Sequence, residues 1–167
     1  RLLLVGERSA TLGAQLIEQG WALYVLGSGD QSLEGRLQVL RDASPHVAAH
    51  LGYDEELAHL VYAASDALVI PSRFEPCGLS QMIAMRYGTL PIARATGGLR
   101  DTIDHLETGF LFEELTAEAL TTTAKEALDL YASRNWQQMM RAAMSRDFSW
   151  RSSARRYQEV YELTARG

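Results

Sequence analysis

The 167-residue chain suits one compact domain, and its 47% hydrophobic residues are enough for a sizeable core. The formal net charge of −5, from 16 basic and 21 acidic residues, excludes non-specific binding to nucleic-acid phosphates as a function. No apolar run approaches the roughly 20 residues of a membrane span. The single cysteine cannot form an internal disulfide, which favours a reducing compartment.

Short apolar runs alternate with helical patterns over the first two thirds of the chain, which predicts βαβ units and a parallel sheet. The expected strands are 2–5, 22–26, 47–51, 67–70, 90–93 and 110–112, and the expected helices are 9–19, 31–43, 54–64, 79–87 and 99–105. Three further helices, expected at 116–132, 135–146 and 150–164, close the core. Ser9, Asp54 and Ser149 are expected helix caps. The predicted fold class is α/β, a Rossmann-like doubly wound parallel sheet with extra C-terminal helices.

The loop after the expected strand 67–70 holds a glutamate and the chain's only cysteine. In parallel α/β sheets, ligands bind where strands end and helices begin. The N–H groups of Gly78, Leu79 and Ser80 are expected to open the next helix without intrahelical partners, which suits a phosphate. Glu75 precedes that helix and can reach a sugar hydroxyl. The alternative makes Glu75 a solvated loop residue and Cys77 a small buried apolar side chain; the spacing favours a binding loop.

Glycines also follow three other expected strands. Gly97 and Gly98 open a second helix towards the same crevice, or form a plain turn with Asp101 in the first helical turn. The Gly-Ser-Gly-Asp run at 27–30 lacks a third glycine, so an ordinary turn with a capping aspartate is favoured there. Tyr53, beside Gly52, is expected either to stack on a base or to cover the sheet edge, and the two interpretations stay open.

Other polar and aromatic residues show no catalytic spacing. The histidines have no metal-ligand spacing among themselves, and no Ser-His-Asp arrangement is present, so they are interpreted as surface or packing residues. They are His46, His50, His59 and His105. Trp21, Trp136 and Trp150 are interpreted as packing residues.

Together these segments resemble the bacterial glycogen synthase and plant starch synthase family. These are retaining GT-B glycosyltransferases that transfer glucose from ADP-glucose to a growing α-1,4-glucan. The resemblance covers nearly the whole chain and rests on the runs Leu-Gly-Ser-Gly-Asp at 26–30, Pro-Ser-Arg-Phe-Glu-Pro-Cys-Gly-Leu at 71–79, Arg-Tyr-Gly-Thr-Leu-Pro at 86–91, Thr-Gly-Gly-Leu-Arg-Asp at 96–101, Thr-Gly-Phe-Leu-Phe at 108–112 and Asp-Phe-Ser-Trp at 147–150. Within GT-B enzymes the Glu-Pro-Cys-Gly-Leu run is specific to this family, whereas the glycine turns are not.

The resemblance implies a role for each motif. Glu75 would contact the hydroxyls of the donor glucose, and Cys77 would line this catalytic site. The remaining donor-binding residues would be Gly78, Leu79 and Ser80 around the diphosphate, Gly97, Gly98 and Leu99 beside the glucose, and Tyr53 against the adenine. ADP-glucose is the donor substrate, and neither a metal nor a cofactor is implied.

The sequence also departs from the family pattern. The family places a lysine of a Lys-Gly motif near Leu4, where this chain reads Leu-Leu-Leu-Val-Gly at 2–6; either that cation is lost or the register differs there. GT-B enzymes have two Rossmann-like domains, and this chain matches only the second. We expect a donor domain at 1–148 and a helix at 149–167 that packs towards a separate N-terminal domain, through which the glucan binds.

The opening at Arg1 rather than Met is consistent with part of a longer protein. The chain alone is then expected to be inactive, and its parent to be a glucan synthase of the bacterial cytoplasm or the plastid, without nucleic-acid or membrane partners. Two alternatives remain. One is a non-catalytic nucleotide-sugar-binding or regulatory homologue, and the other is a GT-B enzyme that uses a UDP-sugar.

Overall fold

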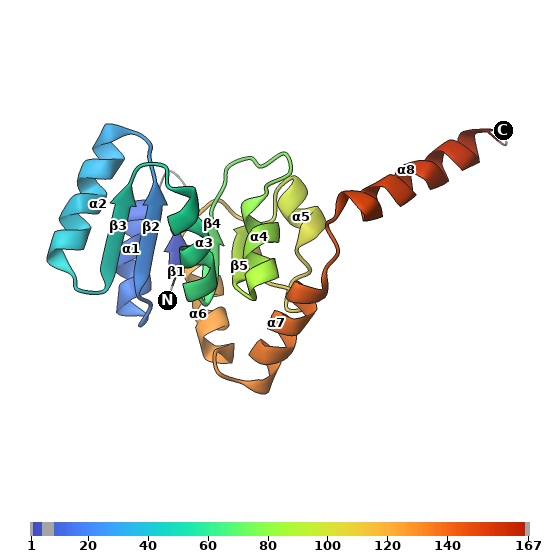
Figure 1. Cartoon of the computed structure of the whole chain (residues 1–167). Coiled ribbons are helices and arrows are strands. Elements are labelled where there is room, and N and C mark those ends of the chain that lie inside the picture. The colour runs from blue at the N-terminus through green and yellow to red at the C-terminus, as the bar shows by residue number, and fades with distance from the viewer. Residues whose placement is uncertain (1, 5–8, 166–167) are drawn as a thin grey trace.

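A parallel β-sheet forms the centre of the molecule (Figure 1). The computed structural model describes residues 2–4 and 9–165. Within them the strand order is β3-β2-β1-β4-β5-β6, and each neighbouring pair is parallel. All the carboxyl ends therefore lie at one edge of the sheet. The strands are β1 (Leu2–Leu4), β2 (Leu23–Gly27), β3 (Val47–Leu51), β4 (Ala67–Ile70), β5 (Leu90–Arg94) and β6 (Phe110–Phe112).

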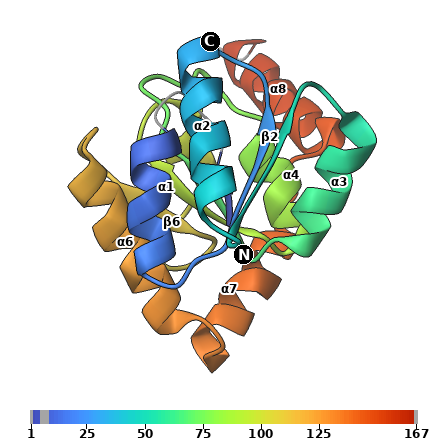
Figure 2. The same ribbon diagram turned by 90° about the vertical axis from the view of Figure 1, so that its left-hand side faces the viewer.

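Helices cover both faces of the sheet, with α1 and α2 on one side and α3 and α4 on the other (Figure 2). In β4, Ala67 and Val69 belong to the core on one face, while Leu68 and Ile70 belong to the core on the other. This burial on both faces explains why the strands show little alternation. The predicted doubly wound α/β fold is confirmed. The helices are α1 (Ser9–Glu18), α2 (Gln31–Ala43), α3 (Glu55–Ala64), α4 (Ser80–Tyr87), α5 (Gly98–Thr102), α6 (Ala117–Leu130), α7 (Arg134–Ser145) and α8 (Trp150–Ala165).

The two helices after β6 complete the body of the molecule. Trp136 of α7 is 3% exposed, and its ring lies 6.0 Å from that of Phe110 and 5.4 Å from that of Tyr131. Trp21 is also 3% exposed. The packing role predicted for these two tryptophans is confirmed, and helices α6 and α7 close the core as expected.

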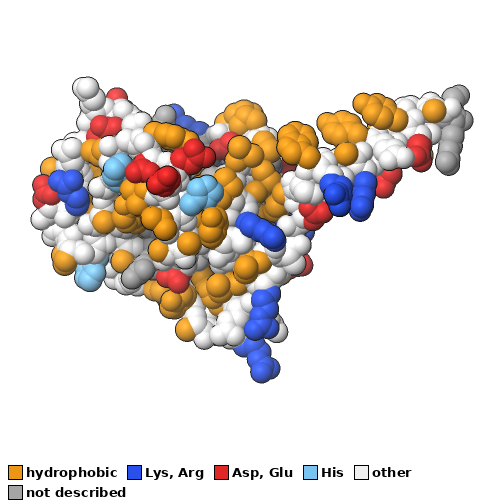
Figure 3. Space-filling view, in the orientation of Figure 1, with side chains coloured by type: hydrophobic (Ala, Val, Ile, Leu, Met, Phe, Trp, Pro, Cys, Tyr) orange, Lys and Arg blue, Asp and Glu red, His pale blue; other side chains and the backbone are white. Residues whose placement is uncertain are grey.

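Helix α8 does not close the core, in contrast to one of the two sequence-based expectations for it; the other, that it packs towards a separate domain, stays a prediction. It projects away from the body (Figure 1), and none of its described residues is buried. Trp150 is 88% exposed, so the packing role predicted for it is wrong within the described part of the chain. Aromatic side chains line one side of the projecting helix (Figure 3). Trp150, Tyr157 and Tyr161 lie on the same side of α8 and form one exposed apolar stripe along it.

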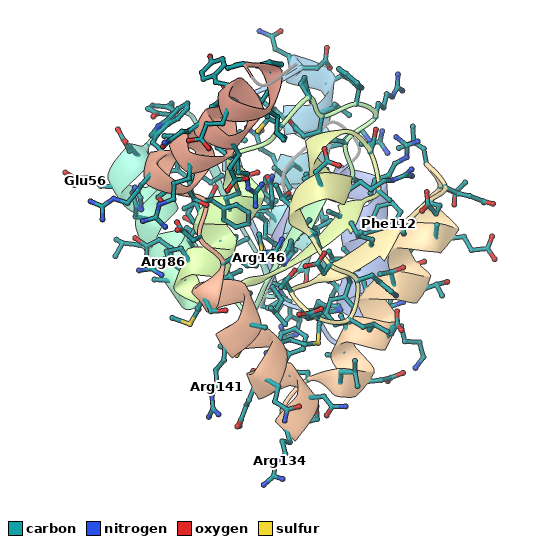
Figure 4. All side chains as sticks on the ribbon, turned by 90° about the vertical axis from the view of Figure 1, so that its right-hand side faces the viewer. Glu56, Arg86, Phe112, Arg134, Arg141 and Arg146 are labelled. Carbon is teal, nitrogen blue, oxygen red and sulfur yellow. The ribbon has the colours of Figure 1, made fainter. Side chains whose placement is uncertain are left out.

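Two residues tie the segment between α7 and α8 to the body, Arg146 through an ion pair and Phe148 through packing against the core. The Arg146 guanidinium donates to the carboxylate of Asp104 over 2.7 Å. Figure 4 shows Arg146 near the centre of the view, whereas Arg134 and Arg141 of α7 point away from the body. The ion pair fixes the end of α7, and the chain leaves the body after the partly buried Phe148.

Most element boundaries match the sequence-based expectations, and the differences are local. Helix α5 ends at Thr102 instead of residue 105, because the backbone of Ile103 is extended. The predicted caps are confirmed for Asp54 and Ser149, which accept hydrogen bonds from backbone amides. Ser9 is the first residue of α1 instead of its cap, and its side chain lies outside the described part. Nowhere in residues 2–4 and 9–165 is a helix both long and apolar enough to cross a membrane.

Candidate functional site

The loop between β4 and α4 carries the predicted catalytic residues. Strand β4 is buried along its whole length and brings the chain to the carboxyl edge of the sheet. Glu75 is half-buried there, and the Ser72 hydroxyl donates to its Oε2 over 3.5 Å. Cys77 is exposed. The alternative of a buried apolar cysteine is therefore wrong, and both side chains lie where a ligand at this edge can reach them.

A second loop, between β5 and α5, packs backbone to backbone against the first. The Gly98 amide donates to the Glu75 carbonyl over 3.0 Å. A Cβ atom at Gly97 would collide with that same carbonyl oxygen, and one at Gly98 would lie 2.5 Å from Cys77 Cα. Gly97 also has a φ of +47°, which L side chains rarely adopt. The structure thus brings together two predicted groups that are twenty residues apart in sequence.

The helices that start at these loops lack side-chain caps. The caps of α2, α3, α6 and α7 each accept a backbone amide in the first turn. The corresponding positions of α4 and α5 are Leu79 and Gly97, and neither makes a side-chain cap hydrogen bond. The first N–H groups of a helix need partners from outside the helix and favour an anion. Among α2 to α7, the two starts without a side-chain cap are the two predicted to hold phosphate and sugar. At α5 the Gly98 and Leu99 amides already donate to the Glu75 and Thr96 carbonyls, so the amides open to an anion are those of α4.

Tyr53 lies further along the same edge, at the end of β3. Its side chain is 88% exposed, so it does not cover the sheet edge as a packing residue. Three strand spacings separate β3 from β4 in the sheet, a distance of about 14 Å. The predicted base-stacking residue therefore lies after the outermost strand, and the predicted sugar-binding residue follows a strand in the middle of the sheet.

The turn after β2 is structural, as predicted. The Asp30 carboxylate accepts the amides of Ser32 and Leu33 at the start of α2. Hydrogen bonds from the Ser32 hydroxyl, the Ser32 amide and the Leu33 amide lower the pKa of Asp30 below its usual value. The Gly52 amide donates to the Gly27 carbonyl over 3.0 Å and ties this turn to the one that holds Tyr53.

Two side chains that support the site were not predicted from the sequence. Arg94, at the end of β5, donates to the carbonyls of Ser72 and Arg73 in the first loop. Gln81 is fully buried in α4 and donates to the carbonyl of Cys77. The available signals were a basic residue directly after an expected strand and a glutamine on the apolar side of an expected helix.

The histidines do not gather into a site. The His59 ring contacts the Tyr87 hydroxyl over 2.9 Å, and His105 accepts the Leu111 amide over 3.0 Å. In the part of the chain that the structure describes, no group of three or more His, Cys, Asp and Glu residues is arranged to hold a metal ion. These histidines serve the surface and local packing.

The comparison with known proteins agrees with the fold. A model of the family "Glycosyl transferases group 1" matches residues 10–144. The chain belongs to this family. Its glycosyltransferase fold is also that of the catalytic domain of starch synthase IV from Arabidopsis thaliana, bound to ADP and acarbose. That structure matches with a TM-score of 0.80 and 35% identity over 99% of this chain and 38% of its own. Sucrose-phosphate synthase from Thermosynechococcus elongatus matches with a TM-score of 0.73 and 28% identity, over 99% and 46% of the two chains.

Curated relatives of this glycosyltransferase chain include bacterial glycogen synthases. That of Thermodesulfovibrio yellowstonii is 47% identical over 148 residues, which is 87% of this chain and 30% of the relative. That of Mannheimia succiniciproducens is 45% identical over 157 residues, which is 87% of this chain and 33% of the relative. The resemblance to glycogen and starch synthases is therefore confirmed. The chain spans about a third of the length of these relatives.

Proposed function

We propose that this chain is the C-terminal, donor-binding domain of a glucan synthase. The parent protein would transfer glucose from ADP-glucose to the non-reducing end of an α-1,4-glucan, with retention at the anomeric carbon. The observation that carries the proposal is the pair of uncapped helix starts at the carboxyl edge, interlocked through the hydrogen bond from Gly98 to Glu75. Among the relatives, the starch synthase IV catalytic domain binds ADP.

The roles of the site residues follow from the chemistry of the transfer. Departure of ADP builds negative charge on phosphate while an oxocarbenium-like centre forms on the sugar. The amides of Gly78, Leu79 and Ser80, with the Ser80 hydroxyl, would hold the diphosphate and stabilise that charge without solvent rearrangement. Glu75 would bind the glucose hydroxyls, and Cys77 would line the same pocket.

The other end of the donor and the sugar's far side are assigned by position. Tyr53 would stack on adenine, for which its exposed ring is free. Gly97, Gly98 and Leu99 would border the glucose. The Leu99 side chain is fully buried, so only its backbone can take part. The proposal includes neither a metal ion nor a cofactor.

The partner of helix α8 belongs to the same proposal. Residues 149–167 would pack on a second Rossmann-like domain of the parent, and that domain would bring the glucan acceptor to the donor site. The exposed stripe of Trp150, Tyr157 and Tyr161 supports this assignment. The chain alone would then bind the donor without turnover. We infer a reducing compartment, either a bacterial cytoplasm or a plastid, and neither nucleic-acid nor membrane partners.

Calorimetric titration of the chain with ADP tests the donor site. We expect weak, saturable binding in the millimolar range, because both loops and Tyr53 are present while the opposite domain is absent. AMP should bind more weakly than ADP, since it lacks the second phosphate. UDP should also bind more weakly, since a pyrimidine offers Tyr53 a smaller ring. Absence of heat at millimolar ADP would contradict the proposal, and a preference for UDP would favour a UDP-sugar enzyme.

A second candidate function rests on Leu4, which stands where the family places a phosphate-binding lysine. Residues 5–8, at the carboxyl end of β1, lie outside the described part. Loss of that cation would weaken leaving-group stabilisation and favour a binding or regulatory homologue without turnover. The parent protein should be assayed for incorporation of labelled glucose from ADP-glucose into glucan. Incorporation supports the synthase, and ADP binding without incorporation supports the second candidate.

A further inference from the structure

Gln81 is a buried polar residue at the junction of the two glycine-containing loops. It belongs to the first turn of α4, and it is 0% exposed. Its Nε2 atom lies 2.9 Å from the Cys77 carbonyl, 3.0 Å from the Gly78 carbonyl and 3.1 Å from the Thr102 hydroxyl. The side chain therefore reaches both the loop before α4 and the end of α5.

Thr102 continues this connection to the second loop. Its hydroxyl donates to the Gly98 carbonyl over 2.6 Å and accepts from Gln81. The Gly98 amide in turn donates to the Glu75 carbonyl. A closed set of hydrogen bonds thus runs from Gln81 through Thr102 and Gly98 to Glu75, and back along the first loop to Cys77.

A glutamine at position 81 is unfavourable for the stability of the core. Gln81 Oε1 is buried, and within the described part of the chain it has no hydrogen-bond partner. An unpaired buried oxygen lowers stability, and an apolar side chain of similar size would avoid that cost. The side chain also occupies the space that a Cβ atom at Gly78 would need. Gln81 instead fixes the conformation of the loop before α4, because its side-chain amide donates to the carbonyls of Cys77 and Gly78.

We propose that Gln81 is a positioning residue that, through Thr102, holds the loops 75–78 and 97–98 together as one preorganised donor cradle. This inference rests on the proposed function as far as the donor is concerned. Its consequence is that the amides around the phosphate and the backbone around the sugar cannot move independently. Preorganised groups bind a developing charge without reorganisation, so loosening either loop weakens both.

The test combines two measurements on the chain. Gln81→Met keeps the side-chain volume and removes the donors. We expect the Gly98 amide to exchange its hydrogen at least about tenfold faster, beyond any change at the Val69 amide of β4, because its acceptor loop loses its anchor. We expect the Kd for ADP to rise about tenfold as well, since two net hydrogen bonds are lost. Thr102→Val should produce both effects, and Thr102→Ser, which keeps the hydroxyl, should restore both values.

Thr89→Val is the matched control. Thr89 is also buried, and its hydroxyl donates to the Tyr62 and Ser65 carbonyls at the opposite edge of the sheet. This variant should lower the thermal midpoint and leave the Gly98 exchange and the ADP affinity unchanged.

The outcomes separate the inference from the proposed function. If Gln81→Met fails to fold, the pair of Thr102 variants decides. The positioning role is overturned if the Gly98 amide of Gln81→Met or of Thr102→Val exchanges its hydrogen within twofold of the wild-type rate. It is also overturned if Thr89→Val speeds that exchange by the same factor as they do. If the wild-type chain does not bind ADP, the proposed function fails, while the exchange rates still decide whether Gln81 holds the loops.

Discussion

At Gly98 the backbone of α5 passes so close to Cys77 that no side chain fits between them. A Cβ atom there would lie 2.5 Å from the Cys77 Cα and carbonyl oxygen, which are backbone atoms that cannot swing aside. Gly98→Ala should therefore push the two loops apart, lower the free energy of unfolding by about 1–3 kcal/mol and weaken ADP binding. Urea unfolding and calorimetry measure the two effects.

Gly29→Ala provides the comparison for Gly98→Ala. Gly29 lies in a turn at the same edge, and an added Cβ atom would have nothing within 4 Å. Its free energy of unfolding should change by less than about 0.5 kcal/mol. Equal stability and equal ADP affinity in the two variants would show that the loops separate at no cost, contrary to the close packing described here.

At the scale of single residues, the sequence predicted which loops carry the candidate site and missed how these loops are held together. The glycines at 78, 97 and 98 were predicted because a glycine after an apolar strand marks a strand-to-helix turn. That Gly98 contacts Glu75 depends on two strands pairing side by side, which local pattern does not contain. Gln81 and Arg94 bond to backbone carbonyls, acceptors that every residue offers, so their residue types reveal no partner.

At the scale of elements, most boundaries were predictable because cap residues and glycines mark the ends of helices and strands. Asp54 and Ser149 precede helices as N-cap residues do, and the strands β3, β4 and β6 are bounded by polar residues, glycine or proline. Helix α5 was predicted too long, because the chain becomes extended at Ile103 and the Asp104 amide donates to the Thr108 hydroxyl over 2.9 Å. The acceptor of that bond lies four residues after the donor, whereas in a helix it lies four residues before. Helical periodicity therefore does not predict this turn.

Side-chain caps also distinguish the two helix starts at the candidate site from the other helix starts. Helices α2, α3, α6 and α7 satisfy their first amides with their own side chains. A cap of this kind contributes about 1 kcal/mol of stability, and α4 and α5 lack it. The first amides of α5 donate to backbone carbonyls instead, those of Gly98, Leu99 and Arg100 to Glu75, Thr96 and Gly97. The start of α4 is therefore the one of these two at which a ligand is expected to provide the partners.

At the scale of the whole molecule, the body and α8 are held by different means. The body has two cores on the faces of one sheet, and the segment before α8 is tied to it by the ion pair of Arg146 with Asp104 and by the packing of Phe148. Helix α8 carries three exposed aromatic rings on one side and no buried residue. An apolar stripe of this kind marks an interaction surface. The sequence pattern predicted the helix, whereas periodicity alone does not say whether its apolar side lies on the body or away from it.

Truncation of the chain after Ser149 tests this division. Because no described residue of α8 is buried, removing the helix should change the thermal midpoint of the body by less than about 2 °C. Trp136→Ala is the contrasting variant: it removes a ring that is 3% exposed and should cost about 3–5 kcal/mol. A large drop in the midpoint on truncation would mean that α8 packs on the body in solution. In the parent protein the same truncation should lower stability and glucan synthesis, because there the stripe would have a second domain to cover it.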